Sequence, residues 1–260
     1  MNRFFKYHGG GNDFIFIYDP NKNFNDSPDF IHTLCMRQTG IGADGLILIH
    51  NAKKEGVDFE MRYFNADGYE GSMCGNGGRC AVAFAKKMGI IQNKAYFHGI
   101  DGFHHGQIIK EEGNKHEVSI QMINVNSIIP FESGYFLNTG SPHVVIFVQN
   151  IEDYDVIKEG KRIRYHSDFP QGTNVNFVEI KEDHIFVRTF ERGVEDETLS
   201  CGTGVTASSL AYSLINPINK INVQTRGGHF KVSFSKDNNN FKNIVLEGPT
   251  CFVFEGKINI

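Results

Sequence analysis

The chain has 260 residues, of which 40% are apolar and 22% charged, and its formal net charge is −4. This length suffices for one large domain or two smaller ones, and the composition excludes a disordered chain. The small acidic excess argues against a dedicated nucleic-acid-binding protein, which would carry a basic face. No apolar run approaches the ~20 residues of a membrane-spanning helix, and the first residues lack the apolar stretch of a secretory signal.

The cysteines are odd in number and form no Cys-x-x-Cys pair, which argues against both a disulfide framework and a zinc cage. We therefore expect free thiols, no metal site and a reducing, cytoplasmic setting. The 23 phenylalanines predict an aromatic-rich core. The five cysteines are Cys35, Cys74, Cys80, Cys201 and Cys251.

Short apolar runs between glycines predict strands along the whole chain. A helix is predicted to start at Ser27 and Pro28, with the hydroxyl as its cap, and to end at Gly40. The predicted strands, in chain order, are Phe14–Tyr18, Gly45–Ile49, Val57–Tyr63, Val144–Val148, Asn176–Ile180 and Ile185–Thr189.

Two further helices are predicted, one after Cys74 and one after Cys201, and Gly89 and Pro217 are expected to stop them. Their inward faces have the same spacing from each cysteine. These faces are Ala81, Phe84, Ala85 and Met88 in the first helix, and Ser208, Ala211, Tyr212 and Ile215 in the second.

The chain also resembles itself. Five segments recur in the same order at offsets of 126 to 131 residues: 9–18 with 139–148, 42–49 with 173–180, 64–77 with 190–204, 100–108 with 226–234, and 118–123 with 244–249. Such a repeat predicts two copies of one α/β unit. We place the N-terminal half at residues 1–128 and the C-terminal half at 129–260. Each half should be a mostly antiparallel or mixed sheet wrapped round one buried helix.

Each half contains one Cys-Gly-x-Gly turn at a predicted helix start, at Cys74 and at Cys201. The first turn of a helix has unpaired N–H groups and a partial positive charge, which favour a thiolate and bind carboxylates. Two such thiols suit epimerisation at a carbon acid, because one removes a proton while the other returns a proton to the opposite face. No lysine motif marks a pyridoxal phosphate site, so no cofactor is expected.

Eight motifs, in order over nearly the whole chain, resemble those of the diaminopimelate epimerase family. They are HGGGNDF (8–14), GIGADG (40–45), FNADG (64–68), MCGNGGRC (73–80), GSPH (140–143), GTNVNF (172–177), ERG (191–193) and SCGTG (200–204). The resemblance implies two pseudo-symmetric α/β domains with the active site in the cleft between them, usually as a homodimer. It also allows the C-terminal strand to join the N-terminal half.

The resemblance implies a cofactor-independent isomerase. Two cysteines of this family interconvert LL- and meso-diaminopimelate, in lysine and peptidoglycan-precursor biosynthesis, and Cys74 and Cys201 match them. His143 and Glu191 match polar residues that would tune or orient the thiols. The implied substrate-binding residues are Asn12, Asn65, Gly75, Asn76, Asn174, Glu191, Arg192, Gly202 and Thr203. A guanidinium at Arg192 suits a distal carboxylate.

The sequence departs from the family pattern at Ser141, where many members have asparagine, and at Gly45, where some have glutamine. The remaining cysteines are interpreted as structural, and the other ten histidines as exposed or structural rather than as metal ligands. The acidic residues Glu195–Glu197 are interpreted as a solvated loop.

Three alternative functions stay open. Proline racemases and hydroxyproline epimerases share the two thiols but usually have histidine where this chain has Asn76. Isomerases of the phenazine-biosynthesis type share the fold but lack the cysteine pair. A non-enzymatic small-molecule binder that has kept an old site is the third.

Overall fold

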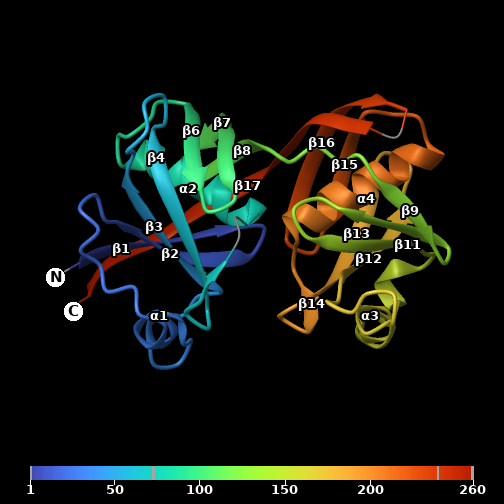
Figure 1. Ribbon diagram of the computed structural model, residues 1–260, viewed down its shortest axis with the longest axis horizontal. Helices are drawn as coiled ribbons and strands as arrows, with labels where there is room; N and C mark the ends of the chain where they lie inside the picture. Colours follow the sequence, from blue (N-terminus) through green and yellow to red (C-terminus); the bar gives the residue numbers. More distant parts are fainter. Residues whose placement is uncertain (1, 72–73, 239, 259–260) are drawn as a thin grey trace. The chain divides into compact units, whose positions relative to one another are not determined.

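The computed structural model describes residues 2–71, 74–238 and 240–258. The chain divides into two compact units (Figure 1). Unit 1 comprises Met1–Ile120 and Gly248–Ile260, and unit 2 comprises Gln121–Glu247. The sequence prediction placed the boundary between residues 128 and 129. The last strand, β17 (Asn240–Ile258), begins in unit 2 and ends in unit 1.

Unit 1 is a mixed sheet with two helices. Its elements are β1 (Asn2–Gly9), β2 (Asn12–Tyr18), α1 (Pro28–Cys35), β3 (Gly45–Asn51), β4 (Phe59–Asn65), β5 (Glu70–Gly71), α2 (Gly75–Lys87), β6 (Lys94–Gly99), β7 (Gly102–Glu112) and β8 (Lys115–Gln121). β2 pairs with β3, and β4 with β6, in parallel. The antiparallel pairs β8–β17, β17–β1 and β1–β2 then close the sheet on itself.

Helix α2 packs against β1, β2, β3 and β7 inside this closed sheet. Successive side chains of a strand point to opposite faces of the sheet. Phe16 therefore contacts Phe84 of α2, with ring centroids 5.1 Å apart, while Ile15 and Ile17 join Ile31 of α1 in a second buried cluster. Because both faces are covered, the strands read as continuous apolar runs. The aromatic-rich core is confirmed.

Unit 2 repeats the plan. Its elements are β9 (Ile128–Phe131), β10 (Gly134–Asn138), β11 (Pro142–Phe147), a 3₁₀ turn at Ile151–Asp153, α3 (Val156–Arg164), β12 (Asn174–Ile180), β13 (Ile185–Glu191), β14 (Asp196–Thr198), α4 (Gly202–Ile215), β15 (Lys220–Thr225), β16 (Gly228–Asp237) and the first part of β17. β11 and β12 pair in parallel, as do β13 and β15. Helix α4 packs against β10–β13, β15 and β16. The predicted α/β fold, with one buried helix in each half, is confirmed.

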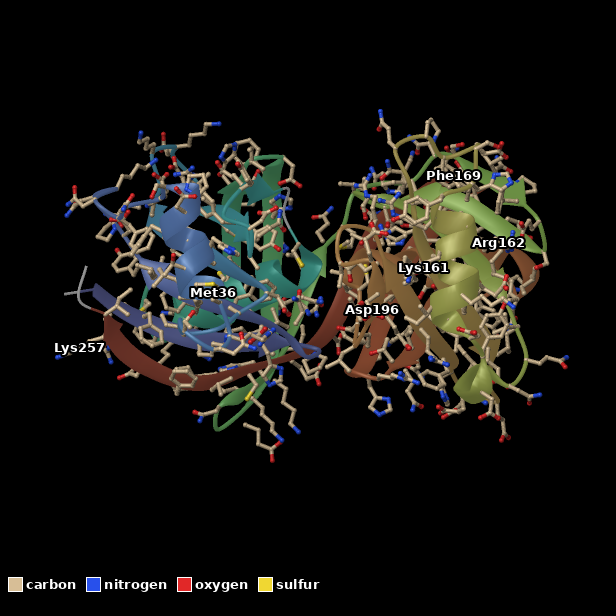
Figure 2. All side chains as sticks on the ribbon, turned by 90° about the horizontal axis from the view of Figure 1, so that it is seen from below. Met36, Lys161, Arg162, Phe169, Asp196 and Lys257 are labelled. Atoms are coloured by element: carbon tan, nitrogen blue, oxygen red, sulfur yellow. The ribbon has the colours of Figure 1, made fainter. Side chains whose placement is uncertain are left out.

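Helix α3 was not predicted, although it occupies the place in unit 2 that α1 has in unit 1. Asp155 caps it by accepting a hydrogen bond from the Lys158 amide at 3.0 Å. Val156 and Ile163 then pack on the outer face of the sheet. Figure 2 labels Lys161 and Arg162 on this helix and Asp196 on the neighbouring β14.

The three predicted helices start where expected, but their details differ. Helix α1 ends at Cys35 rather than Gly40, and Ser27 makes no side-chain capping bond. Met88 is half-buried, and Ile215 is exposed because α4 ends there. No helix in the described ranges has the length and apolarity to cross a membrane.

Candidate active site

Cys74 and Cys201 occupy equivalent positions in the two units. Each is the N-cap of its unit's buried helix, with extended backbone (φ −89° and ψ 129° for Cys74, φ −121° and ψ 113° for Cys201). The Cys74 carbonyl accepts from the Gly78 amide at 2.7 Å, and the Cys201 carbonyl from the Val205 amide at 2.8 Å. Each thiol therefore lies at the end of a helix where backbone N–H groups point outward. Met73, the first residue of the motif MCGNGGRC, lies outside the described residues.

In unit 1 the Cys74 thiol meets the first residue of β2. Its Sγ donates to Oδ1 of Asn12 at 3.6 Å, and Asn76 Nδ2 reaches the same oxygen at 3.5 Å. Asn12 in turn donates from Nδ2 to Oδ2 of Asp44 at 2.8 Å. The structure therefore brings together Cys74, Asn12 and Asn76.

Asp44 belongs to a charged cluster that holds the start of β2 in place. Arg37 bridges Asp13 and Asp44, with Nη2–carboxylate distances of 2.9 and 2.6 Å. Lys6 pairs with Asp13 at 2.7 Å. Burial alone would raise the pKa of Asp13, but the hydrogen bonds from Arg37 and Lys6 outweigh it and lower that pKa to about 2. Asp13 therefore stays ionised, and Asn12 is fixed on a rigid strand end.

A fully buried guanidinium, that of Arg79, supports the first turn of α2. It donates from Nη1 to the Gly75 carbonyl at 3.0 Å and from Nη2 to Asn76 Oδ1 at 2.6 Å. The first bond gives a carbonyl of the first helical turn a second donor, and the second orients the Asn76 amide. Burial lowers the pKa of Arg79, and the nearby sulfurs of Cys80 and then Cys74 oppose this lowering.

Asn65 ends β4 and is exposed, and its Oδ1 accepts from the Tyr63 hydroxyl at 2.8 Å. Gly45 lies opposite Asn65 in the sheet register. A Cβ at Gly45 would approach the Phe64 carbonyl oxygen to 2.5 Å and the Tyr63 ring to 2.6 Å. A larger residue at this position would therefore meet both the β4 backbone and the Tyr63 ring, so the local packing suits glycine.

In unit 2 the Cys201 thiol leads into a chain of hydrogen-bonding side chains. Its Sγ lies 3.4 Å from Oγ1 of Thr203, and that hydroxyl lies 2.9 Å from Nε2 of His143. Ser141 Oγ is 3.0 Å from the same Nε2 and 3.2 Å from Thr203 Oγ1. The sequence departure at Ser141 therefore puts a hydroxyl into this cluster.

Two asparagines of β12 support the cluster. Asn174 donates from Nδ2 to Ser141 Oγ at 3.3 Å and to the Pro142 carbonyl at 3.0 Å, and its Oδ1 accepts from the Arg192 amide at 2.9 Å. Asn176, which the sequence analysis did not single out, donates to His143 Nδ1 and to the Val144 carbonyl, both at 3.0 Å. Asn174 thereby ties the segment after β13 to the start of β11.

Glu191 and Arg192 lie at the end of β13 and are both half-buried. Glu191 Oε2 accepts from the Thr198 hydroxyl at 2.8 Å, and Arg192 donates from Nη1 to the Gln171 carbonyl at 3.2 Å. The positive charge of Arg192 is felt at His143, where it adds to burial in lowering the imidazole pKa.

The interpretation of Glu195–Glu197 as a solvated loop was wrong for Glu195 and Glu197, whereas Asp196 is exposed. Glu197 forms two bonds of 2.7 Å with Arg188, and both side chains are largely buried. Glu195 accepts from Arg164 at 2.9 Å and from the Tyr165 hydroxyl at 2.8 Å. These pairs anchor the segment that delivers Cys201 to the start of α4.

The other cysteines have no comparable surroundings. Burial raises the pKa of Cys35 to about 12 and raises that of Cys80 further, so both stay protonated. Cys251 donates to the Phe252 carbonyl at 3.3 Å. Within 2–71, 74–238 and 240–258, no group of three or more His, Cys, Asp or Glu side chains could hold a metal ion.

Two clusters therefore contain most of the predicted site residues. Cys74, Gly75, Asn76 and Asn12 lie together in unit 1, whereas Asn65 lies on β4, which β3 separates from β2. Cys201, Gly202, Thr203, His143 and Asn174 lie together in unit 2, where Asn174 also binds the backbone of Arg192. Sequence reasoning missed Arg79, Asn176 and Thr189, although Arg79 and Asn176 stand inside the quoted motifs MCGNGGRC and GTNVNF.

Solved structures with this fold include a PhzF-family phenazine biosynthesis protein of Bacillus anthracis, with a TM-score of 0.76 and 16% identity over 100% of this chain and 99% of that chain. A hydroxyproline epimerase of Agrobacterium vitis has a TM-score of 0.70 and 15% identity over 98% and 91%. These likenesses establish the fold.

Sequence relatives are more specific. A diaminopimelate epimerase of Flavobacterium psychrophilum is 47% identical over 98% of this chain and 100% of its own length. The enzyme of the same name from Aquifex aeolicus is 41% identical over 98% and 97%. The diaminopimelate epimerase family model matches residues 4–127 and 135–253. With both cysteine turns at the starts of equivalent helices, this chain belongs to the diaminopimelate epimerase family.

Proposed function

We propose that this chain is an isomerase that interconverts LL- and meso-diaminopimelate, with Cys74 and Cys201 as its two acid/base groups. The observation that supports the pair is their equivalence, since each is the N-cap of the buried helix of its unit. A reaction whose substrate and product are mirror images at one carbon needs the same kind of group on each face.

The proton balance is simple. One cysteine, as thiolate, takes the α-proton and becomes a thiol. The other, as thiol, gives its proton to the opposite face of the carbanion and becomes a thiolate. No net proton is consumed, and the reverse reaction exchanges the two roles. The reaction needs both thiols to reach one α-carbon at the same time.

The first turns of α2 and α4 are proposed to bind the α-carboxylate. The amides of Gly75, Asn76, Gly202 and Thr203 belong to these turns, where N–H groups lack helical partners. Their dipoles also stabilise the negative charge that develops as the α-proton leaves. Glycine suits this position because it lets the backbone approach a ligand closely.

The remaining predicted residues are proposed to hold the rest of the substrate. Asn12, Asn65 and Asn174 offer amide groups, and Arg192 offers a guanidinium for the distal carboxylate. Glu191, half-buried beside Thr198, would accept from the distal ammonium. His143 is proposed to act on Cys201 through Thr203.

Proton exchange tests the proposal directly. In heavy water, without pyridoxal phosphate, the enzyme should introduce deuterium at the α-carbon of LL-diaminopimelate and form the meso isomer. Cys74→Ala and Cys201→Ala should each abolish isomer formation, because each removes the only base on one face. Full turnover by either variant would contradict the assignment of two bases.

Cys251→Ala is the matched control, because Cys251 is a half-buried thiol that donates to the Phe252 carbonyl. The Cys251→Ala variant should retain wild-type turnover. Proline and hydroxyproline serve as alternative substrates, and faster turnover of either would favour the racemase alternative. A cytoplasmic location and a homodimer remain predictions, and sedimentation of the purified protein would test the second.

A further inference from the structure

The imidazole of His143 lies wholly inside unit 2, with no exposed surface. Both ring nitrogens have partners. Nδ1 faces the Asn176 amide at 3.0 Å, and Nε2 faces the hydroxyls of Thr203 and Ser141 at 2.9 and 3.0 Å. The position of the ring proton therefore decides which way the hydroxyl of Thr203 points.

The backbone carbonyl of Val144 identifies the donor group of Asn176. A carbonyl oxygen can only accept, so the Asn176 atom 3.0 Å from it is the amide nitrogen. The same nitrogen faces His143 Nδ1, which must then accept as well. The Thr189 hydroxyl completes the arrangement by donating to Asn176 Oδ1 at 3.0 Å.

Since Nδ1 accepts, the ring proton is on Nε2. His143 is also neutral, because burial and then the nearby charge of Arg192 lower its pKa to about 3. The Nε2–H of the neutral imidazole faces the oxygens of both Thr203, at 2.9 Å, and Ser141, at 3.0 Å. Ser141 Oγ also accepts from Asn174 Nδ2, so its own hydrogen points to Thr203 Oγ1 at 3.2 Å. The Thr203 oxygen therefore accepts, and its hydrogen points at the Cys201 sulfur, 3.4 Å away.

We infer that Asn176 is a positioning residue that holds His143 in the Nε2–H tautomer, so that Thr203 donates its hydroxyl hydrogen to Cys201. This inference rests on the proposed role of Cys201 as an acid/base group. A hydrogen bond to the thiolate stabilises it over the thiol. Asn176 thus acts on the reaction through His143 and Thr203 without touching the substrate.

The repeat shows that the fold itself does not need an amide at this place. Gly77 and Gly204 are each the third residue after a motif cysteine. A Cβ on Gly77 would meet Ile47 at 3.0 Å, whereas a Cβ on Gly204 would meet Asn176 Oδ1 at 2.3 Å. Unit 1 therefore fills the equivalent place with an apolar side chain. Burying an amide is unfavourable unless it is hydrogen-bonded, so the asparagine of unit 2 calls for a reason beyond packing.

The tautomer can be observed in the unmodified enzyme. In protein labelled with ¹⁵N-histidine, the His143 resonances, assigned by their loss in His143→Gln, should show a protonated Nε2 and an unprotonated Nδ1. The pattern should not change between pH 5 and pH 9. A proton on Nδ1, or titration of the ring within this range, would overturn the inference without any variant.

Asn176→Asp replaces the donor with an acceptor at nearly constant volume. The carboxylate should draw the ring proton to Nδ1, so that Nε2 accepts from Thr203 and Cys201 loses its donor. Alkylation of Cys201 by iodoacetamide, followed peptide by peptide, should then need a higher pH by about one unit, while Cys74 keeps its profile. We expect kcat to fall about tenfold, since one such hydrogen bond is worth about 1.4 kcal/mol, and KM to change by less than about twofold.

Asn176→Leu places an apolar side chain at the position equivalent to Ile47. In this variant both tautomers of His143 should be populated, and the pH profile of Cys201 alkylation should be intermediate. Asn222→Asp makes the same chemical change at an exposed position of β15 and should leave both readouts at wild-type values. If Asn176→Asp keeps the wild-type Cys201 profile and kcat, Asn176 does not position His143. Full turnover by Cys201→Ala would instead refute the proposed function, whatever the Asn176 variants do.

Discussion

Arg79 donates a 2.6 Å hydrogen bond to Asn76 within the first turns of α2, and neither side chain is open to solvent. The same guanidinium donates to the Gly75 carbonyl. In unit 2 the equivalent carbonyl, that of Gly202, accepts from the Thr206 hydroxyl at 3.0 Å. The two cysteine turns are therefore braced alike, but only the turn of Cys74 has a buried cation.

Arg79→Lys tests this brace. An ammonium keeps the charge but cannot reach both acceptors with the planar fork of a guanidinium. We expect the free energy of unfolding to fall by about 1–3 kcal/mol and kcat/KM by about tenfold, measured by urea denaturation and steady-state kinetics. Arg3→Lys, at an exposed pair with Glu255, is the control and should change stability by less than about 0.5 kcal/mol. Wild-type kinetics in Arg79→Lys would mean that Asn76 is oriented without the guanidinium.

Tyr63→Phe tests the proposed substrate contact of Asn65. The Tyr63 hydroxyl occupies one lone pair of Asn65 Oδ1 and so holds the Asn65 amide in one orientation. Losing it should raise KM for diaminopimelate about two- to tenfold, the equivalent of one neutral hydrogen bond, with kcat nearly unchanged. Tyr18→Phe removes a hydroxyl with the same geometry, 2.8 Å from Asn51 Oδ1, and should leave KM at the wild-type value. An equal rise in both variants would argue against a specific role for Tyr63.

The parts of the fold that could be predicted were those marked in the sequence by glycine turns or by the periodicity of apolar residues. The duplicated Cys-Gly-x-Gly turns revealed both the repeat and the starts of α2 and α4. Helix α3 was missed because its exposed side is strongly basic and only Val156, Gly160 and Ile163 are buried. Such a short inward stripe resembles a polar connection. The repeat, which aligns 9–18 with 139–148 and 42–49 with 173–180, could have located α3 because α1 lies between the matching segments of unit 1.

Site residues that belong to a family motif could be predicted from the sequence. Residues whose role depends on their being buried could not. Asn176 and Thr189 are polar residues in strands, and a polar residue in an alternating strand usually faces water. Here the sheet curves round α4, so the face that carries them is buried. Likewise Glu197 was interpreted as a solvated residue because its partner, Arg188, lies on the preceding strand and their pairing is not apparent in the sequence.

The buried neutral His143 predicts how stability depends on pH. Its pKa is lowered in the folded protein to about 3, from 6.5 when unfolded, so the unfolded chain binds an extra proton between these values. Stability from this residue is therefore complete above pH 6.5 and is lost as the pH falls toward 3. Between pH 7 and pH 5 the wild type should lose about 2 kcal/mol more than His143→Gln, measured by urea denaturation.

The contributions of other groups that titrate in this range, such as His8 and His116, are shared by both proteins and cancel in the difference. Equal losses in wild type and His143→Gln would show that His143 accepts a proton inside the folded protein. That result would also remove the basis for a fixed neutral donor beside Thr203.

The buried ion pair of Glu197 and Arg188 predicts a large loss of stability when the Glu197 carboxylate is replaced by an amide. Arg188 is 6% exposed, and its Nη1 also donates to the carbonyls of Ile151, Glu152 and Tyr154. Glu197→Gln would leave the Arg188 guanidinium buried without its carboxylate partner, so we expect the free energy of unfolding to fall by about 3 kcal/mol. Because β14 leads directly to Cys201, kcat should fall as well.

Glu159→Gln is the matched control, since Glu159 pairs at 2.9 Å with Arg162, whose side chain is 46% exposed. Water can replace that interaction, so stability should change by less than about 0.5 kcal/mol. Differential scanning calorimetry of the two variants separates the cases. Similar small losses in both would mean that water reaches Arg188 as readily as Arg162, and the segment before Cys201 would then owe its position to its backbone pairing with β13 rather than to this charge pair.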